Sequence, residues 1–259
     1  MKYLRFMAGE EILQGITDGF GYVKVISGDI SGDYVVTGRQ FPLEEISRYL
    51  PPTIPSKIIA VGLNYRAHAE ETGMNIPEEP LLFLKPPSSA IAHGEAVVYP
   101  SGLTERVDYE AELGVVIGRK CRNILPEKAE KYILGYTCFN DITARDLQSR
   151  DGQWTRSKSF DTFAPFGPWV AMGIDPSNLD IRLIQNDKVV QHSSTSDFIF
   201  KVPFVVSFIS RIMTLNPGDV IATGTPSGIG PVEVGDLLTV RIEGVGELQN
   251  RVVAEERVK

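Results

Sequence analysis

Acidic residues cluster at the start of one apolar segment and at the end of another. Glu110 and Glu112 come just before the apolar run of residues 113–118, and Asp141 follows residues 133–140. The run after Glu112 is short and rich in β-branched residues, which predicts a buried strand. Side chains alternate between the two faces of a strand, so Glu110 and Glu112 are expected to point the same way.

Two neighbouring carboxylates repel each other unless a cation lies between them, and Asp141 could supply a third oxygen ligand. A ligand set of carboxylates without cysteine or histidine favours Mg²⁺ or Mn²⁺ over zinc. The alternative is that Glu110 and Glu112 face solvent on a half-exposed strand. Spacing alone slightly favours this alternative, because Glu-x-Glu is common in acidic proteins.

A histidine and a glutamate share one face of a predicted short helix. Asn64 suits the N-cap and Gly73 the position after the C-terminus, so residues 64–73 read as helical. His68 and Glu71 are three residues apart and therefore lie on one face. Such a short helix needs tertiary support, so it could act as a lid over a ligand. The alternative is a solvated His–Glu pair on the surface.

Lys158 lies between a polar segment, residues 143–154, and the apolar residues 160–170. The polar segment reads as a loop. Partial desolvation at this boundary would lower the pKa of Lys158 and suit it to chemistry. The alternative is an ordinary solvated lysine.

These side chains must be positioned by a β-rich chain with a small first unit. Residues 1–50 contain short β-type runs separated by Gly, Asp and Ser turn formers. The prolines of residues 51–56 predict a stiff linker. A unit of this size is expected to pack on the main body, residues 57–259.

The main body reads as mostly strands with few short helices. Predicted strands cover residues 57–62, 81–85, 113–118, 133–140, 181–186, 188–191, 220–223 and 237–242. Further helices are predicted at residues 126–132 and 204–213. The Gly-rich residues 224–231 lack the pattern of a phosphate-binding loop or a dinucleotide fingerprint. We expect that loop to direct the Thr225 hydroxyl and backbone N–H groups into a cleft.

Composition places the chain among soluble globular proteins. Of its 259 residues, 42% are hydrophobic and 23% charged, and the net charge is −7. No basic block occurs, so we expect no nucleic-acid partner. We also expect no signal peptide or membrane span, because no apolar run is long enough. Cys121 and Cys138 indicate a reducing, cytoplasmic setting with unpaired thiols.

Several short motifs follow one another along the chain in a specific order: Val61–Glu71, Leu82–Pro86, Asp108–Leu113, Asp141–Asp146, Lys158–Phe160 and Gly224–Gly228. This order resembles the fumarylacetoacetate hydrolase superfamily. The resemblance covers residue 57 to the C-terminus and is greatest to small bacterial members and to the acylpyruvase/oxaloacetate decarboxylase type. Residues 1–50 resemble the small N-terminal domain that many bacterial members carry.

The resemblance implies an α+β, β-rich fold: a mixed β-roll core with few short helices and a small N-terminal β domain, usually assembled as a homodimer. It implies Mg²⁺ or Mn²⁺ held by Glu110, Glu112 and Asp141, with water completing the shell. It implies that His68 and Glu71 activate water on a mobile helix, and that Lys158 is the cationic or proton-donating group. The implied substrate contacts are Arg145, Gln148 and Thr225.

A 2-oxo acid chelates a hard cation through its carboxylate and keto oxygens, which makes an enolate accessible. Because the His68–Glu71 pair and Lys158 are both present, we expect C–C hydrolysis of an acylpyruvate-like 2,4-dioxo acid, with a role in aromatic catabolism. The alternatives from the same enolate are isomerisation of the 2-hydroxyhepta-2,4-diene-1,7-dioate type and oxaloacetate decarboxylation or tautomerisation. An alternative of a different class is a non-catalytic protein that binds a metal or a 2-oxo acid.

Overall fold

Strand β11, Ala111–Ile117, is buried along its whole length. The computed structural model describes residues 1–73 and 75–256. Leu113 and Val115 face one hydrophobic core, whereas Val116 faces another. A strand that is covered on both faces has a continuous apolar sequence, which explains why the run after Glu112 shows no polar alternation.

The first 50 residues and the rest of the chain contribute strands to one large sheet. Across this sheet the order is β4 (Tyr34–Pro42), β3 (Tyr22–Gly28), β2 (Glu11–Thr17), β1 (Lys2–Ala8), β14 (Ala164–Ala171), β12 (Ile133–Asn140), β11, β17 (Val220–Ala222), β6 (Ile58–Gly62) and β7 (Leu81–Lys85). In addition, β5 (Arg48–Leu50) pairs with β1, and β8 (Ala90–Ile91) pairs with β14. The sheet is mixed, because β17 runs parallel to β6 and antiparallel to β11.

A second sheet packs against β11 and β12. Its strands, in order, are β16 (Lys188–Ser194), β15 (Asp180–Gln185), β19 (Leu237–Ile242), β20 (Gly246–Ala254) and β9 (Val97–Tyr99). Leu183 and Val240 from this sheet share a hydrophobic core with Val115 of β11. A small third sheet has the order β13 (Thr143–Ala144), β10 (Val107–Tyr109) and β18 (Gly230–Pro231).

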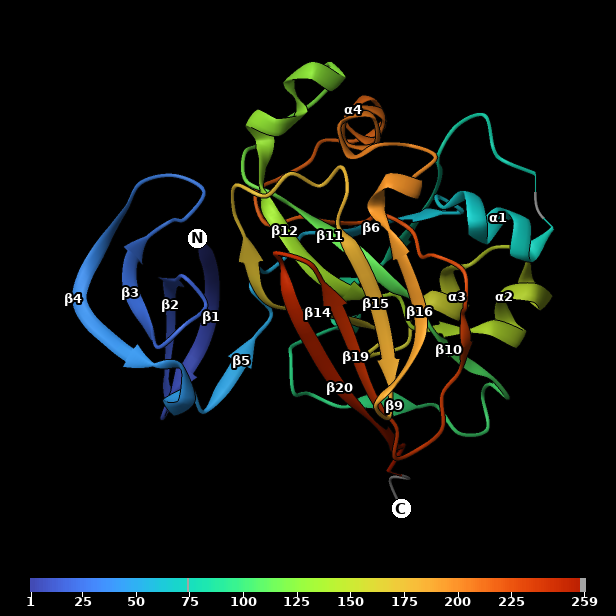
Figure 1. Cartoon of the computed structure of the whole chain (residues 1–259), viewed down its shortest axis with the longest axis horizontal. Helices are drawn as coiled ribbons and strands as arrows, with labels where there is room; N and C mark the ends of the chain where they lie inside the picture. Colours follow the sequence, from blue (N-terminus) through green and yellow to red (C-terminus); the bar gives the residue numbers. More distant parts are fainter. Residues whose placement is uncertain (74, 257–259) are drawn as a thin grey trace.

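The helices are short and lie outside the sheets. They are α1 (Arg66–Thr72), α2 (Arg145–Asp151), α3 (Thr155–Lys158) and α4 (Val202–Ile212), with 3₁₀ helices η1 (Leu43–Glu45), η2 (Pro87–Ser89), η3 (Pro126–Tyr132) and η4 (Thr195–Asp197). Figure 1 shows α1, α2 and α3 together at the end of the molecule opposite β1–β4. In the part of the chain that the structure describes, no helix has the length and apolarity to cross a membrane. The predicted β-rich α+β fold is confirmed.

The first 50 residues pack on the remainder, as predicted from their small size. Strand β1 pairs with β14 through Lys2 opposite Ala171 and Tyr3 opposite Val170. The Pro-rich residues 51–56 are also packed, since the Thr53 hydroxyl donates to the carbonyl of Gly218 at 2.8 Å. This segment therefore makes a direct hydrogen bond to the main body.

The prediction that Asn64 caps the first helix is wrong. Helix α1 begins at Arg66, preceded by Tyr65, and Asn64 makes no cap hydrogen bond. Its buried amide instead donates to the carbonyl of Thr223 at 2.7 Å, and its oxygen accepts from Phe200 N at 2.7 Å. A buried amide thus ties three distant segments together. Gly73 does end the helix in the left-handed region, as predicted.

The prediction of a loop over residues 143–154 is also wrong, because this segment contains α2. Leu147 is the buried residue of this seven-residue helix. A helix with a single buried apolar side chain gives no recurring apolar period, so its sequence reads as polar and irregular. Tertiary contacts stabilise it, as they must for a helix of this length.

Candidate metal centre

Three carboxylates meet where strand β11 begins and strand β12 ends. The antiparallel register pairs Ala111 with Asn140. Glu110 and Asp141 are the next residues outward on each side, and Asp141 N donates to the carbonyl of Glu110 at 2.9 Å. Glu112 lies one pleat further along, and one oxygen from each of the three carboxylates falls within 4.8 Å of the others. All three residues are buried.

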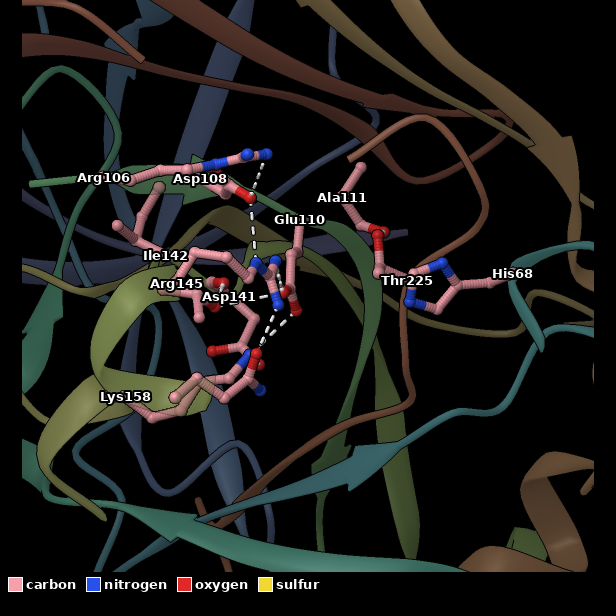
Figure 2. A network of polar contacts seen from close by, with 12 residues as sticks. His68, Arg106, Asp108, Glu110, Ala111, Asp141, Ile142, Arg145, Lys158 and Thr225 are labelled. Carbon is pink, nitrogen blue, oxygen red and sulfur yellow. Dashed lines mark hydrogen bonds and ion pairs between the residues drawn. The ribbon is translucent and has the colours of Figure 1, made fainter. Parts of the chain in front are cut away.

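Cations surround two of these carboxylates. Lys158 Nζ lies 2.9 Å from Glu110 Oε2 and 2.7 Å from Asp141 Oδ2, and Figure 2 shows this contact. Burial opposes ionisation of Glu110, but the charges of Lys158 and Arg145 outweigh it and lower the Glu110 pKa to about 2. Glu110 is therefore ionised at neutral pH, and the positive charges of Lys158 and Arg145 balance its negative charge.

Glu112 differs, because no lysine or arginine that the structure describes pairs with it. Its Oε2 accepts a hydrogen bond from Gly224 N at 2.7 Å. Burial, followed by repulsion from Asp141 and Glu110, raises the Glu112 pKa well above its usual range. A buried carboxylate beside two others is stabilised by a cation between them. The donor set is all oxygen, so these residues fit a hard divalent cation such as Mg²⁺ or Mn²⁺.

Lys158 is buried as expected, but the predicted lowering of its pKa is wrong. Burial does disfavour the ammonium, yet Asp141 and then Glu110 outweigh it and raise the Lys158 pKa above the ordinary value. The ammonium also lies 5.0 Å from the centre of the Phe83 ring. Lys158 is thus a buried, stably charged cation within a carboxylate cluster.

A second lysine, Lys85, reaches the same cluster and was not predicted to have a role. It ends strand β7, and its Nζ donates to Asp141 Oδ1 and to the carbonyl of Ile142. Burial and repulsion by Lys158 lower its pKa, against the attraction of Asp141. The signal in the sequence is a lysine that ends an apolar run directly before two prolines.

Arg145 and Gln148, from the first turn of α2, line the cavity beside Glu110. Arg145 Nε donates to Asp108 Oδ2 at 2.9 Å, and Arg145 Nη2 pairs with Glu110 Oε1. Arg145 Nη1 donates to Gln148 Oε1 at 2.5 Å. Asp108 also pairs with Arg106, at 2.7 Å. Together these contacts fix the guanidinium beside Glu110, and Figure 2 shows those that link Arg106, Asp108, Arg145 and Glu110.

Thr225 follows Gly224 in the glycine-rich loop and lines the cavity. Its hydroxyl donates to the carbonyl of Ala111 at 2.9 Å and accepts from Gln191 Nε2 at 3.0 Å. The loop also offers backbone donors, with Gly224 N bonded to Glu112 and Gly228 N bonded to Glu71 Oε1 at 2.9 Å. Thr225 lines the cavity, but its hydroxyl and these two N–H groups are bonded to protein atoms, so their contact with a ligand stays a prediction.

His68 extends from α1 toward the carboxylates. Figure 2 shows its ring pointing past Thr225 in the direction of Glu110 and Asp141. His68 Nδ1 lies 3.0 Å from Glu71 Oε2. The His68 side chain is 12% exposed and that of Glu71 38%. If Nδ1 carries the proton donated to Glu71, the other ring nitrogen keeps a lone pair for proton abstraction.

One cavity of about 200 Å³ collects these groups. Eight residues with predicted roles line it: His68, Glu110, Glu112, Asp141, Arg145, Gln148, Lys158 and Thr225. Glu71 reaches the cavity through its contact with His68. Phe83 and Trp154 line it as well and were not predicted. The arrangement combines a cation site, a paired histidine and fixed positive charge in a small space.

Comparison with known proteins gives a family match over most of the chain. Residues 57–253 match the model described as fumarylacetoacetate (FAA) hydrolase C-terminal, and residues 1–52 match the one described as Rv2993c-like, N-terminal. The chain is 42% identical over 210 residues to a 4-hydroxyphenylacetate degradation bifunctional isomerase/decarboxylase of Salmonella dublin, covering 80% of this chain and 49% of that protein.

Two solved structures are also similar. A 2-hydroxyhepta-2,4-diene-1,7-dioate isomerase from Mycobacterium marinum superposes with a TM-score of 0.92 at 38% identity, covering 99% of this chain and 100% of that one. A maleylpyruvate hydrolase from Sphingobium sp. SYK-6, in complex with manganese(II) ion and pyruvate, gives a TM-score of 0.82 at 30% identity, with the same coverage. The resemblance found in the sequence is confirmed.

Proposed function

This chain belongs to the fumarylacetoacetate hydrolase family, and we propose that it is a Mg²⁺- or Mn²⁺-dependent enzyme that hydrolyses a C–C bond of an acylpyruvate-like 2,4-dioxo acid. The observation that carries the proposal is that one cavity receives both the three carboxylates and the ring of His68. Hydrolysis needs both a site for the 2-oxo acid and a base for water.

Glu110, Glu112 and Asp141 would hold the cation. Once bound, it would supply a Lewis acid that stabilises negative charge on the keto oxygen of a 2-oxo acid. The chain keeps this ligand set in place through other contacts. Lys85 and Lys158 hold the two oxygens of Asp141. Partners of this kind orient metal ligands and are costly to remove.

In the proposed reaction, His68 takes a proton from water while Glu71 holds the opposite ring nitrogen. The water oxygen bonds to the C4 carbonyl carbon of the 2,4-dioxo acid. The C3–C4 bond then breaks, and its electron pair stays with C3. The proton taken from water is returned to C3, which gives pyruvate, while the acyl group leaves as a carboxylic acid. Lys158 keeps a positive charge in the cavity throughout, which favours the anionic substrate.

A second candidate is isomerisation or decarboxylation of a 2-oxo diacid. It is supported by the activities for which two similar proteins are named, an isomerase and an isomerase/decarboxylase. The same cavity would serve, because these reactions share the step that places negative charge on the keto oxygen. Hydrolysis ranks first because it gives the His68–Glu71 pair a function.

A substrate panel tests the proposal. Acetylpyruvate, oxaloacetate and 2-hydroxyhepta-2,4-diene-1,7-dioate are each incubated with the enzyme and Mg²⁺, Mn²⁺ or EDTA, and the products are identified. We expect pyruvate and acetate from acetylpyruvate with either metal and none with EDTA. Faster conversion of either diacid would favour the second candidate, and no conversion of any compound would indicate a binding protein.

A further inference from the structure

Trp154 forms part of the cavity wall. Its ring meets the ring of Phe83 edge-on, with centroids 5.2 Å apart. It also lies directly over Gly62 of β6, where an added Cβ would stand 2.7 Å from Trp154 Cζ3. Phe83 and the absence of a side chain at Gly62 therefore set the position of the indole. The Trp154 carbonyl accepts from Lys158 N at 3.1 Å, so the ring is tied to the helix that carries Lys158.

The wall that Trp154 forms with Phe83 is apolar. Val61, Leu63 and Ile229 are further apolar residues that line the same cavity. None of these side chains carries a charge, and the indole N–H is a neutral donor. This part of the cavity is therefore suited to an uncharged group.

The cations of the cavity are already paired with protein carboxylates. Lys158 contacts Glu110 and Asp141. Arg145 contacts Asp108 and Glu110. Among the lining residues that the structure describes, no lysine or arginine lacks a carboxylate partner. A second carboxylate on a substrate would have to compete with these contacts.

Lys85 offers no free charge either. It pairs with Asp141 from outside the cavity lining, so all three cations of the site, Lys85, Arg145 and Lys158, already contact protein carboxylates. A second carboxylate at the far end of the ligand would be desolvated without a free partner, which is costly.

We propose that Trp154 is a specificity-determining residue, whose apolar wall selects 2-oxo acids with a compact, uncharged tail over those with a second carboxylate. The inference rests on the proposed function for the 2-oxo acid head that both kinds of ligand share. It does not depend on cleavage of the C–C bond. The diacid named for the similar isomerase structure would fall in the disfavoured class.

The test compares two ligands of equal size by isothermal titration in saturating Mg²⁺. 2-Oxoglutarate carries a carboxylate at its far end, and 5-methyl-2-oxohexanoate carries an isopropyl group there with the same number of non-hydrogen atoms. We expect 5-methyl-2-oxohexanoate, whose tail is neutral, to bind at least about tenfold more tightly than 2-oxoglutarate. Burying the unpaired tail carboxylate of 2-oxoglutarate should cost at least the free energy that corresponds to this factor. Equal binding, or tighter binding of 2-oxoglutarate, would overturn the inference.

Two variants at one position assign the preference to Trp154. Trp154→Arg places a cation in the wall and should reverse the preference in favour of 2-oxoglutarate. Trp154→Leu, the matched control, should weaken binding of 5-methyl-2-oxohexanoate, but this ligand should still bind more tightly than 2-oxoglutarate. Both keep the backbone contact to Lys158, and circular dichroism checks their folding. An unchanged ratio in Trp154→Arg would refute the role of Trp154.

The outcome also separates this inference from the proposed function. Tighter binding of 5-methyl-2-oxohexanoate with no cleavage of any acylpyruvate would leave the inference standing and refute hydrolysis. Cleavage of acylpyruvates with equal binding of the two ligands would refute the inference and leave hydrolysis standing. No binding of either acid in Mg²⁺ would overturn both.

Discussion

Asp141 lies directly across the β11–β12 ladder from Glu110. The register that pairs Ala111 with Asn140 continues outward by one residue on each strand, and Asp141 N donates to the carbonyl of Glu110 at 2.9 Å. The two carboxylates therefore converge because of backbone pairing. Glu112, on the same side of β11, completes the group.

Removal of Glu112 should separate metal binding from folding. In Glu112→Gln we expect the affinity for Mg²⁺ to fall at least about a hundredfold, since a ligand is lost outright. Without metal, the variant should unfold at the same temperature or higher, because a buried charge beside two like charges has been removed. Thermal unfolding in Mg²⁺ and in EDTA measures both effects.

Glu247→Gln is the matched control for Glu112→Gln, because Glu247 is half-exposed and pairs with Arg241. It should keep the stabilisation by Mg²⁺ seen in the unmodified protein. A Glu112→Gln variant that gains as much stability from Mg²⁺ as the unmodified protein would show that Glu112 is not a ligand.

Lys85 should be essential to the stability of the carboxylate group. Lys85→Met leaves Asp141 Oδ1 and the carbonyl of Ile142 without their buried donor. We expect a loss of about 3 kcal/mol in the free energy of unfolding, measured in urea without metal, because one partner of a buried ion pair is removed.

Lys57→Met is the control for Lys85→Met. Lys57 pairs with Asp219, but its side chain is 21% exposed. Asp219 also keeps hydrogen bonds from Ser56 N and Asn216 N. Lys57→Met should therefore lose clearly less free energy of unfolding than Lys85→Met. An equal loss in the two variants would contradict the role given to Lys85.

Gly224 should tolerate no side chain. Its φ is +95°, and an added Cβ would lie 2.7 Å from the Cβ of Asn64. Gly224→Ala should therefore lose about 2 kcal/mol or more of stability from backbone strain and overpacking together. It should also weaken the response to Mg²⁺, because Gly224 N positions Glu112.

Gly94→Ala isolates the backbone contribution in that comparison. Gly94 has φ +84° but no heavy atom within 4 Å of an added Cβ. It should lose about 1 kcal/mol, the conformational cost alone, and keep its response to Mg²⁺. If the two alanine variants behave alike in calorimetry with and without Mg²⁺, the close contact with Asn64 has no consequence.

Asp236 gives the fold a pH dependence with a defined sign. Burial opposes its ionisation, but hydrogen bonds from Glu233 N and from the amides of Asn186 and Gln185 outweigh it and lower its pKa. A lowered pKa means stability that is present above the unfolded-state pKa, about 3.9, and lost as the pH falls through the folded-state pKa.

Asp236→Asn should therefore be less stable than the unmodified protein at neutral pH. We expect a difference of about 0.5–1 kcal/mol, because the group is partly solvated and screened. The difference should shrink in acid, as Asp236 itself becomes protonated. Melting temperatures of both proteins across the acidic range measure it, and a difference that grows in acid would contradict the assignment.

The sequence predicted those site residues that lie in recognisable motifs. Glu110, Asp141 and Lys158 lie in short motifs with a specific order, and the structure brings them together. Their mutual distances could not be predicted, because they depend on the register between β11 and β12. One sequence does not specify which residues pair across a ladder.

Other features depended on tertiary contacts that leave little trace in sequence. A lysine at the end of a strand reads the same whether it is solvated or, like Lys85, fully buried against a carboxylate. Trp154 is the last residue of the polar segment 143–154, and this segment has no apolar period. The pKa of Lys158 was predicted in the wrong direction, because desolvation was foreseen without the two carboxylates that outweigh it.

Incorporation of isotope from H₂¹⁸O tests the central claim most directly. Acetylpyruvate is incubated with the enzyme and saturating Mg²⁺ in labelled water, beside His68→Ala and the control His192→Ala, which changes an exposed histidine paired with Asp180. We predict one labelled oxygen in the acetate, and a rate about a hundredfold or more lower in His68→Ala but unchanged in His192→Ala. Unlabelled products, or cleavage by His68→Ala at the full rate, would contradict C–C hydrolysis with His68 as the base for water.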